Sequence, residues 1–197
     1  MRSALAAWLL FSATATFAAE SMTVALCNVG HIPDTVLERA RNETTYVFAN
    51  MDVQVHWTDC GAEVGARDVR ARPDFIVRVQ MGGHLTKSGP VSLDSMGRAF
   101  MDGTGYGYMV DAYFSAIRDL AFRFSTAGSD QLLGYAIAHE LGHLLLGAGH
   151  PPNGIMRAYW SEGEVQSINQ QHLKFDSAER AAIVHNLQMR KAIRSQP

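Results

Sequence analysis

The strongest constraint on this chain is a pair of histidines, His139 and His143, that lie four residues apart inside an apolar segment. Around them, residues 131–146 repeat leucine, isoleucine and alanine at helical spacing, which predicts an α-helix with a buried face. Side chains four residues apart on such a helix differ by about 40° around the axis and about 6 Å along it. Both imidazole rings therefore lie on one side of the helix, where they can bind a single metal ion.

Glu140 directly follows the first of these histidines, so its carboxylate can reach a water molecule on the ion without binding the ion itself. The pattern His-Glu-x-x-His on a helix is typical of zinc hydrolases, in which the histidines bind zinc and the glutamate is the general base. Histidines at this spacing also occur by chance as ordinary core or surface residues. Here the apolar helix, a later histidine beyond a glycine and a methionine close behind favour a zinc site.

Both ends of the helix carry recognisable signals. Ser129 or Asp130 is the expected N-cap, and Gly147 is the glycine expected to end the helix in a left-handed turn. After this turn the chain can fold back and bring His150 toward the metal. Because a catalytic zinc site usually has three protein ligands and one water, we expect His150 to join the two helical histidines around one zinc ion.

The stretch from His139 to Met156 resembles the metzincin metallopeptidases, which share His-Glu-x-x-His, a glycine, a third histidine and Gly-Ile-Met. The likeness is greatest to short secreted bacterial members, and weaker similarity extends over residues 53–60 and 133–138. The resemblance implies an α+β fold of the zincin type, with a small mixed twisted sheet, an active-site helix and a short C-terminal helical part. It also implies zinc-dependent hydrolysis of peptide bonds in a peptide or protein substrate.

One spacing departs from the usual metzincin pattern, His-Glu-x-x-His-x-x-Gly-x-x-His. Three leucines separate His143 from Gly147, one residue more than usual, whereas the spacing from Gly147 to His150 is the normal one. An extra helical residue rotates the exit of the chain by about 100° and advances it by about 1.5 Å. We expect Gly149 to absorb this change, because glycine tolerates unusual backbone angles, and His150 to remain the third ligand.

Two residues near the end of the motif have roles that the resemblance suggests. Met156 is expected beneath the histidine rings, where it packs rather than binds metal, although an ordinary core methionine is the alternative. Some metzincins have a tyrosine two residues after this methionine, as an extra ligand or an oxyanion stabiliser. Here Ala158 takes that position and Tyr159 follows it, so we expect Tyr159 to be a packing residue.

Two alternatives to a metzincin-like peptidase remain open. A gluzincin-like hydrolase would take its third ligand from Glu162 or Glu164, in an expected polar loop, or from Glu179. Glu179 is already explained by a capping box with Asp176. The other alternative is an exported zinc-binding or interaction protein without turnover. The irregular spacing favours it, but Glu140 argues against it, because a purely structural zinc site does not need that residue.

Residues 1–19 have the composition of a secretory signal peptide, with Arg2 before an apolar stretch and small residues before Glu20. The apolar stretch is short for a membrane span. We therefore expect residues 20–197 to be exported, secreted or periplasmic, as a single metallopeptidase-like domain without membrane insertion. The 17 basic and 19 acidic residues form no basic block, so nothing indicates a nucleic-acid partner. The sequence does not predict an oligomeric state.

The two cysteines, Cys27 and Cys60, both lie beyond the expected cleavage site. In an oxidising compartment a disulfide between them is favoured, and it would join the first strand to the second. A pair of buried thiols is the alternative.

Apolar periodicity and turn residues predict the other elements. The expected strands are 23–29, 53–57, 75–81, 97–101 and 107–110, and the expected helices are 34–50, 111–124, 130–146 and 177–193. In metzincin-like folds an edge strand lines the cleft and pairs with an extended substrate. Either 97–101 or 107–110 is expected to serve in this way.

Overall fold

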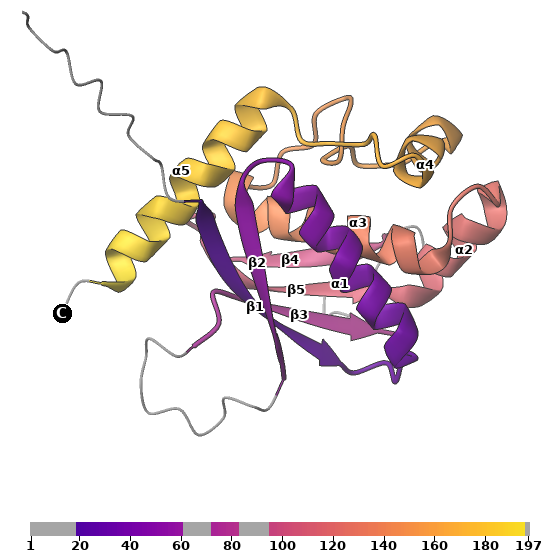
Figure 1. The fold of residues 1–197 in the computed structure, drawn as a ribbon, viewed down its shortest axis with the longest axis horizontal. Coiled ribbons are helices and arrows are strands. Elements are labelled where there is room, and N and C mark those ends of the chain that lie inside the picture. Colours follow the sequence, from indigo (N-terminus) through magenta and orange to yellow (C-terminus); the bar gives the residue numbers. More distant parts are fainter. Residues whose placement is uncertain (1–18, 61–71, 83–94, 196–197) are drawn as a thin grey trace, which may run out of the picture.

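The structure is a computed structural model, and it describes residues 19–60, 72–82 and 95–195. Within these ranges five strands form one twisted sheet (Figure 1): β1 (Glu20–Asn28), β2 (Val53–Asp59), β3 (Phe75–Gln80), β4 (Gly97–Met101) and β5 (Gly107–Tyr113). Their order across the sheet is β2-β1-β3-β5-β4. Neighbouring strands are parallel except β4, which runs antiparallel to β5, so β2 and β4 form the two edges.

The helices of the described ranges are α1 (Asp34–Ala49), α2 (Phe114–Phe124), α3 (Ser129–Leu146), α4 (Glu162–Asn169) and α5 (Ser177–Arg194). Helices α1 and α3 pack against each other on one face of the sheet (Figure 1). Helix α3 contacts β4 and β5, α1 contacts β2, and α5 contacts both α3 and β1. The predicted mixed twisted sheet, long central helix and helical C-terminal part are confirmed.

The core lies between the sheet and helices α1 and α3. Every second residue of a strand points to the same face of the sheet. In β1 and β3 the apolar residues at these alternate positions face the helices. The inward set includes Met22, Val24 and Leu26 of β1 and Phe75, Val77 and Val79 of β3. The buried face predicted for residues 131–146 is confirmed, since Leu133, Ile137, Leu141 and Leu144 of α3 are buried.

Helix α3 is buried on all sides from Leu132 to Leu145, because the sheet covers one side and α1 covers another. The two helices lie close together at Gly134, where a Cβ atom would lie 2.7 Å from the carbonyl oxygen of Ala40. The hydroxyl of Thr44 donates to the Gly134 carbonyl at 2.8 Å across the same crossing. A glycine is therefore required for α3 to sit this deep in the core.

The boundary between β5 and α2 differs from the prediction. The predicted helix 111–124 begins only at Phe114, because the preceding three residues extend β5 to Tyr113 and pair with β3. Asp111 is the reason for the difference, since its buried carboxylate accepts two hydrogen bonds from Arg78 of β3, at 2.6 and 2.9 Å. Pairing across the sheet thus overrides the local helical pattern.

Helix α4 was also missed, because residues 162–164 were expected in a polar loop. Its N-terminus is a capping box, in which Ser161 and Glu164 satisfy each other's backbone N–H groups. The signal Ser-x-x-Glu is present in the sequence and is typical of a helix start. The predicted capping box of α5, between Asp176 and Glu179, is confirmed.

The predicted disulfide between Cys27 and Cys60 is formed, and it joins the C-terminal ends of β1 and β2.

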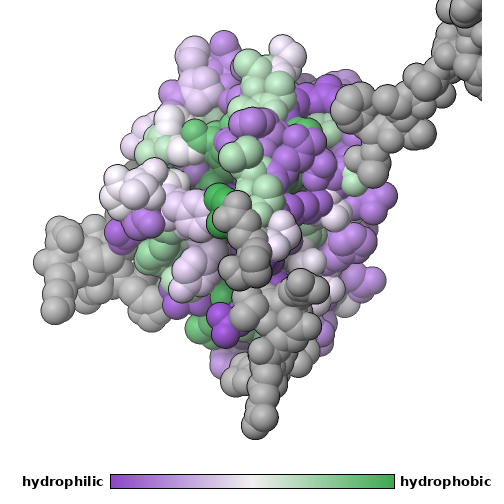
Figure 2. Space-filling view, turned by 90° about the vertical axis from the view of Figure 1, so that its left-hand side faces the viewer, coloured by the Kyte–Doolittle hydropathy of each residue, from purple (hydrophilic) through white to green (hydrophobic). Residues whose placement is uncertain are grey.

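None of the helices in the described ranges has the length and apolar character that a membrane crossing requires. On the face seen in Figure 2, apolar side chains are interspersed among polar ones. Met189 and Ile193 are exposed apolar residues of α5, so this helix combines a buried face with a partly apolar outer face.

Candidate metal centre

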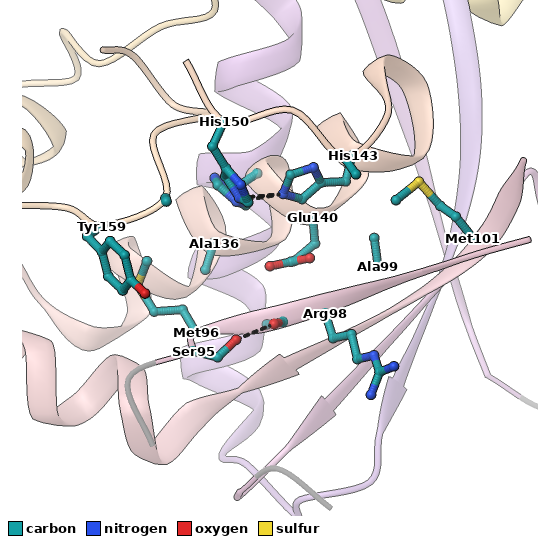
Figure 3. A pocket seen from close by; sticks show the side chains of 14 residues that line it. Ser95, Met96, Arg98, Ala99, Met101, Ala136, Glu140, His143, His150 and Tyr159 are labelled. Carbon is teal, nitrogen blue, oxygen red and sulfur yellow. Dashed lines mark hydrogen bonds between the residues drawn. The ribbon is translucent and has the colours of Figure 1, made fainter. Parts of the chain in front are cut away.

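Three histidine side chains meet at one point beside helix α3 (Figure 3). The Nε2 atom of His143 lies 3.0 Å from Nε2 of His139 and 3.1 Å from Nε2 of His150. The ligand atoms of all three lie within 4.8 Å of one another. Helical spacing brings the first two rings together, and the chain after α3 folds back to deliver the third. The structure therefore gathers all three histidines singled out from the sequence.

Backbone carbonyls fix the two helical rings in a defined orientation. Nδ1 of His139 donates to the carbonyl of Ile155 at 2.7 Å, and Nδ1 of His143 donates to the carbonyl of Gly147 at 2.9 Å. Because a carbonyl only accepts, each Nδ1 carries the proton, and the lone pair of the neutral ring is on Nε2. These lone pairs thus face one another across the site.

This donor set fits a zinc ion. Lone pairs of neutral rings repel one another at 3.0 Å unless a cation lies between them. Tetrahedral zinc with Zn–N bonds of 2.0–2.1 Å holds its nitrogen ligands about 3.3 Å apart, close to the two spacings around His143. Hydrogen bonds from Nδ1 to carbonyls are also the usual support of metal-binding histidines.

Burial keeps the helical histidines in the form that binds metal. Desolvation lowers the pKa of His139 from 6.5 to about 4, against the opposing effect of its hydrogen bond to Ile155. The neighbouring histidines add a further lowering by charge repulsion. Burial also lowers the pKa of the His143 ring. Both rings are therefore neutral at neutral pH, where their Nε2 lone pairs are free to bind a cation.

The ends of α3 differ in detail from those expected. Gly128 is the N-cap rather than Ser129 or Asp130, which are the first two residues of the helix. The carboxylate of Asp130 instead accepts a hydrogen bond from the N–H of Gln131 and pairs with Arg39. At the other end the helix stops at Gly147 as predicted, and the N–H of Gly147 donates to the carbonyl of His143, but the backbone of Gly147 is extended at positive φ and does not adopt the left-handed helical conformation that was expected.

The extra residue after His143 is accommodated at Gly147 and not at Gly149. Gly147 has φ 95° and ψ −172°, a backbone conformation that is essentially restricted to glycine. Gly149 is not among the residues with positive φ, and a Cβ atom there would have no neighbour within 4 Å. The expectation for Gly149 is therefore wrong. Gly147 both ends the extended helix and turns its carbonyl toward the ring of His143.

Glu140 lies on α3 between the metal-facing histidines and strand β4, with its carboxylate in the cleft (Figure 3). A Cβ atom on Gly97 would lie 2.6 Å from the carboxylate oxygen Oε1, so the strand touches this side chain where it lacks one of its own. The backbone N–H of Ala99 donates to the same carboxylate. Residues 97–101 were one of the two candidates for the cleft-lining strand, but the contacts of Gly97 and Ala99 with Glu140 were not predicted, because no local signal relates these residues to the helix.

Burial moves the titration of the Glu140 carboxyl group toward neutral pH. Desolvation raises its pKa from 4.5 to about 8, the hydrogen bond from Ala99 lowers it, and the charge of Asp111 raises it further. A carboxylate whose pKa is near the ambient pH can both accept and release a proton.

A cavity of about 320 Å³ opens over the metal-facing groups. Strand β4 forms one wall, α3 forms the floor, and the chain after α3 contributes Ala148, His150, Ala158 and Tyr159. Of the two strands considered as cleft-lining edges, β4 is an edge and β5 is interior. Tyr159 is 71% exposed and lines the cavity (Figure 3), so the expectation that it is a packing residue is wrong.

Met156 is fully buried and packs against the turn of α3 that carries the histidines. Its sulfur would lie 2.5 Å from a Cβ atom on Gly142, the residue before His143.

The glutamates considered as alternative third ligands either bond to other residues or are not grouped with the histidines. Glu164 pairs with Arg157 and caps α4, and Glu179 caps α5. Within the described ranges, the three histidines form the only group of three or more potential metal ligands.

The sequence matches no family model, and no curated protein matches it either. Solved structures are similar in fold. Archaemetzincin from Methanopyrus kandleri superimposes with a TM-score of 0.52 at 15% identity, over 89% of this chain and 99% of that one. Metalloproteinase-II from Bacteroides fragilis gives a TM-score of 0.52 at 15% identity, over 85% of this chain. This chain has a metallopeptidase-like fold.

The second of these proteins is longer, and the match covers 53% of its chain. At 15% identity both likenesses concern the fold alone. Together with the geometry described above, they mean that this fold carries three histidines positioned to bind a metal ion.

Proposed function

We propose that the protein is an exported zinc-dependent endopeptidase. One observation carries the proposal: the Nε2 atoms of three histidines converge beside the buried carboxylate of Glu140, in a cleft bounded by a sheet edge. The names of the similar structures, an archaemetzincin and a metalloproteinase, support a peptide substrate. A purely structural zinc site usually has four protein ligands, whereas three ligands leave a position open for water.

His139, His143 and His150 hold the zinc ion in this proposal. A bound zinc ion polarises the carbonyl of the substrate and lowers the pKa of a coordinated water to about 7. Glu140 accepts the proton of the attacking water on its carboxylate and then donates it to the nitrogen of the leaving amine. Burial raises the pKa of Glu140 to about 8 in the metal-free protein, and the positive charge of a bound zinc ion would lower it toward the ionised form that a general base needs.

Strand β4 binds the substrate main chain. Within the described ranges it pairs with β5 along one side only, so its other side is open to an extended peptide, apart from the Ala99 N–H that donates to Glu140 and the Gly97 carbonyl that accepts from the Ser95 hydroxyl at 2.6 Å. The same strand donates from Ala99 to Glu140, which keeps the base next to the bound peptide. Gly97 leaves the room that this contact needs.

Export rests on residues 1–19, whose composition is that of a signal peptide. The disulfide between Cys27 and Cys60 supports the proposal, because such bonds persist in oxidising compartments. Appearance of the protein outside the cytoplasm with Glu20 as its first residue tests it, and retention of the leader in the purified protein would contradict it.

Cleavage of a quenched-fluorescent peptide library by the zinc-loaded protein tests the activity. We expect cleavage that is lost on chelation, restored by zinc, and lost in Glu140→Ala although this variant still binds zinc. Glu162→Ala is the matched control, since Glu162 is an exposed glutamate at the start of α4. Cleavage that survives in Glu140→Ala would overturn the role of Glu140. A folded, zinc-loaded wild type that cleaves no peptide would point to a zinc-binding protein without turnover.

A further inference from the structure

Side chains of helix α5 donate hydrogen bonds to the carbonyl groups in the last turn of α3. A helix leaves its last four carbonyls without partners inside the helix, and these groups need other donors. The carbonyl of Leu144 accepts from Nη2 of Arg190 at 2.6 Å, and the carbonyl of Leu145 accepts from Nδ2 of Asn186 at 2.6 Å. Arg190 and Asn186 are four residues apart on α5, so they lie on one face of that helix.

Arg190 also fixes α3 relative to the sheet. Its Nη1 atom donates to the carbonyl of Gly107 at 2.8 Å, where β5 begins. Its guanidinium lies over the ring of Tyr106, 4.0 Å from the centroid, and over Phe75 at 5.2 Å. A planar guanidinium stacked on aromatic rings is held rigidly, and its positive charge suits the C-terminal end of a helix.

The turn that follows connects this end of α3 to the metal-facing histidines. Gly147 comes directly after the helix, and its carbonyl accepts the Nδ1 proton of His143 at 2.9 Å. The chain then runs to His150, whose Nε2 lies 3.1 Å from that of His143. If the last turn of α3 frays, the acceptor that orients His143 and the turn that delivers His150 both shift.

We propose that Arg190 and Asn186 are positioning residues of the metal site. They keep the last turn of α3 intact, and with it the extra helical residue that sets Gly147 in place. The proposal rests on the zinc site of the proposed function, but not on peptide cleavage. The contacts of Arg190 described above are with Leu144, Gly107, Tyr106 and Phe75 and not with the three histidines, so it acts through the carbonyl end of α3.

The test compares two arginines of the same helix. Arg194 also donates to backbone carbonyls, of Arg72 and Pro73, and pairs with Asp74, but these contacts lie away from α3. We expect Arg190→Gln to weaken zinc binding by up to about 10-fold, the lower end of the effect of losing a direct outer partner, because Arg190 acts one contact further from the ligand. Arg194→Gln should leave zinc affinity within about twofold, whatever its effect on the melting temperature.

A second readout needs neither zinc nor activity. In the metal-free protein, the ¹⁵N chemical shifts of the His143 ring report which nitrogen carries the proton. We expect Arg190→Gln to lower the population with the proton on Nδ1, and Arg194→Gln to leave it unchanged. If Arg190→Gln does not fold, Asn186→Ala removes a single hydrogen bond and should change both readouts in the same direction, to a smaller extent.

Unchanged zinc affinity and unchanged ring tautomer in Arg190→Gln and Asn186→Ala would overturn the proposal, even if both variants melt earlier. An equal loss of zinc affinity in Arg190→Gln and Arg194→Gln would overturn it as well. Such a loss would reflect a general decrease in the stability of the protein and not the contact of Arg190 with α3. A wild type that binds zinc but cleaves no peptide would contradict the proposed function and leave this inference standing.

Discussion

His139 and His143 come from a buried helix, whereas His150 comes from the exposed chain that follows it. The two helical histidines are 6% and 7% exposed, and a carbonyl holds the Nδ1 atom of each. Both carbonyls, from Ile155 and Gly147, belong to the chain after the helix. Helix α3 thus brings together two of the proposed ligands, and the following chain orients them and supplies the third. Neither half forms the site without the other.

The largest expected effect on zinc affinity comes from replacing a single histidine, either on α3 or in the chain that follows it. His143→Ala should weaken zinc binding more than His150→Ala, because His143 lies next to both other ligands and is buried with a fixed tautomer. Both losses should exceed the roughly 10- to 100-fold that removal of an outer partner costs. Competition with a chromophoric chelator measures the affinities, and His172→Ala is the control on an exposed histidine. Equal affinities of the two ligand variants would contradict the distinction between the halves.

Gly97→Ala should impair the function of the proposed general base, Glu140, and leave zinc binding intact. A Cβ atom there would lie 2.5 Å from Cγ of Glu140 and 2.7 Å from the carbonyl of Asp111, so Glu140 and β4 must both shift. Because a misplacement of about 1 Å can lower a rate about 100-fold, we expect that loss in kcat with zinc affinity retained. Gly103→Ala, in open space in the chain that follows β4, is the matched control. A normal kcat in Gly97→Ala would show that the strand does not position the base.

Burial of the Glu140 carboxyl group on α3 lowers the stability of the folded protein, and Glu140→Gln should reveal this effect in the zinc-free protein. Burial raises the pKa of Glu140 from 4.5 to about 8, so between these values the unfolded chain loses a proton that the folded chain keeps. Stability of the wild type therefore falls as pH rises through this range. Glu140→Gln should be more stable, by on the order of 3 kcal/mol at pH 7 and by little below pH 4.5. Urea unfolding at several pH values measures the difference, and a difference that does not vary with pH would contradict the shift.

The smallest effect concerns two glycines of the following chain. Gly147→Ala should cost about 1–3 kcal/mol, because its backbone lies in a region that side chains avoid, and should also weaken zinc binding. Gly149→Ala should be neutral or slightly stabilising, since a Cβ atom there meets nothing. Thermal unfolding with and without zinc measures both variants. Similar losses in the two would place the strain elsewhere in the turn.

Local pattern and spacing were sufficient to predict α3, most strands and the histidines that meet. The apolar period of residues 131–146 is strong, and the spacing of His139 and His143 puts them on one face of any helix. The disulfide followed from the expected compartment. Where a local pattern was weak, longer-range contacts decided, as at Asp111, which the ion pair with Arg78 keeps in β5.

The parts of the site that escaped prediction are made by the backbone. The carbonyls of Ile155 and Gly147 orient the rings, and every residue has such a group, so no residue type marks them. The contact of Gly97 with Glu140 arises only when β4 becomes the edge next to α3. The same holds for the bond from Arg190 to Leu144, which joins two helices through their final packing.

X-ray absorption at the zinc edge of the zinc-loaded protein tests the central claim most directly. We predict one zinc ion per chain with three imidazole nitrogens at about 2.0–2.1 Å and one oxygen from water. Two imidazoles with a carboxylate, or four protein ligands, would contradict a site built from His139, His143 and His150 with an open fourth position.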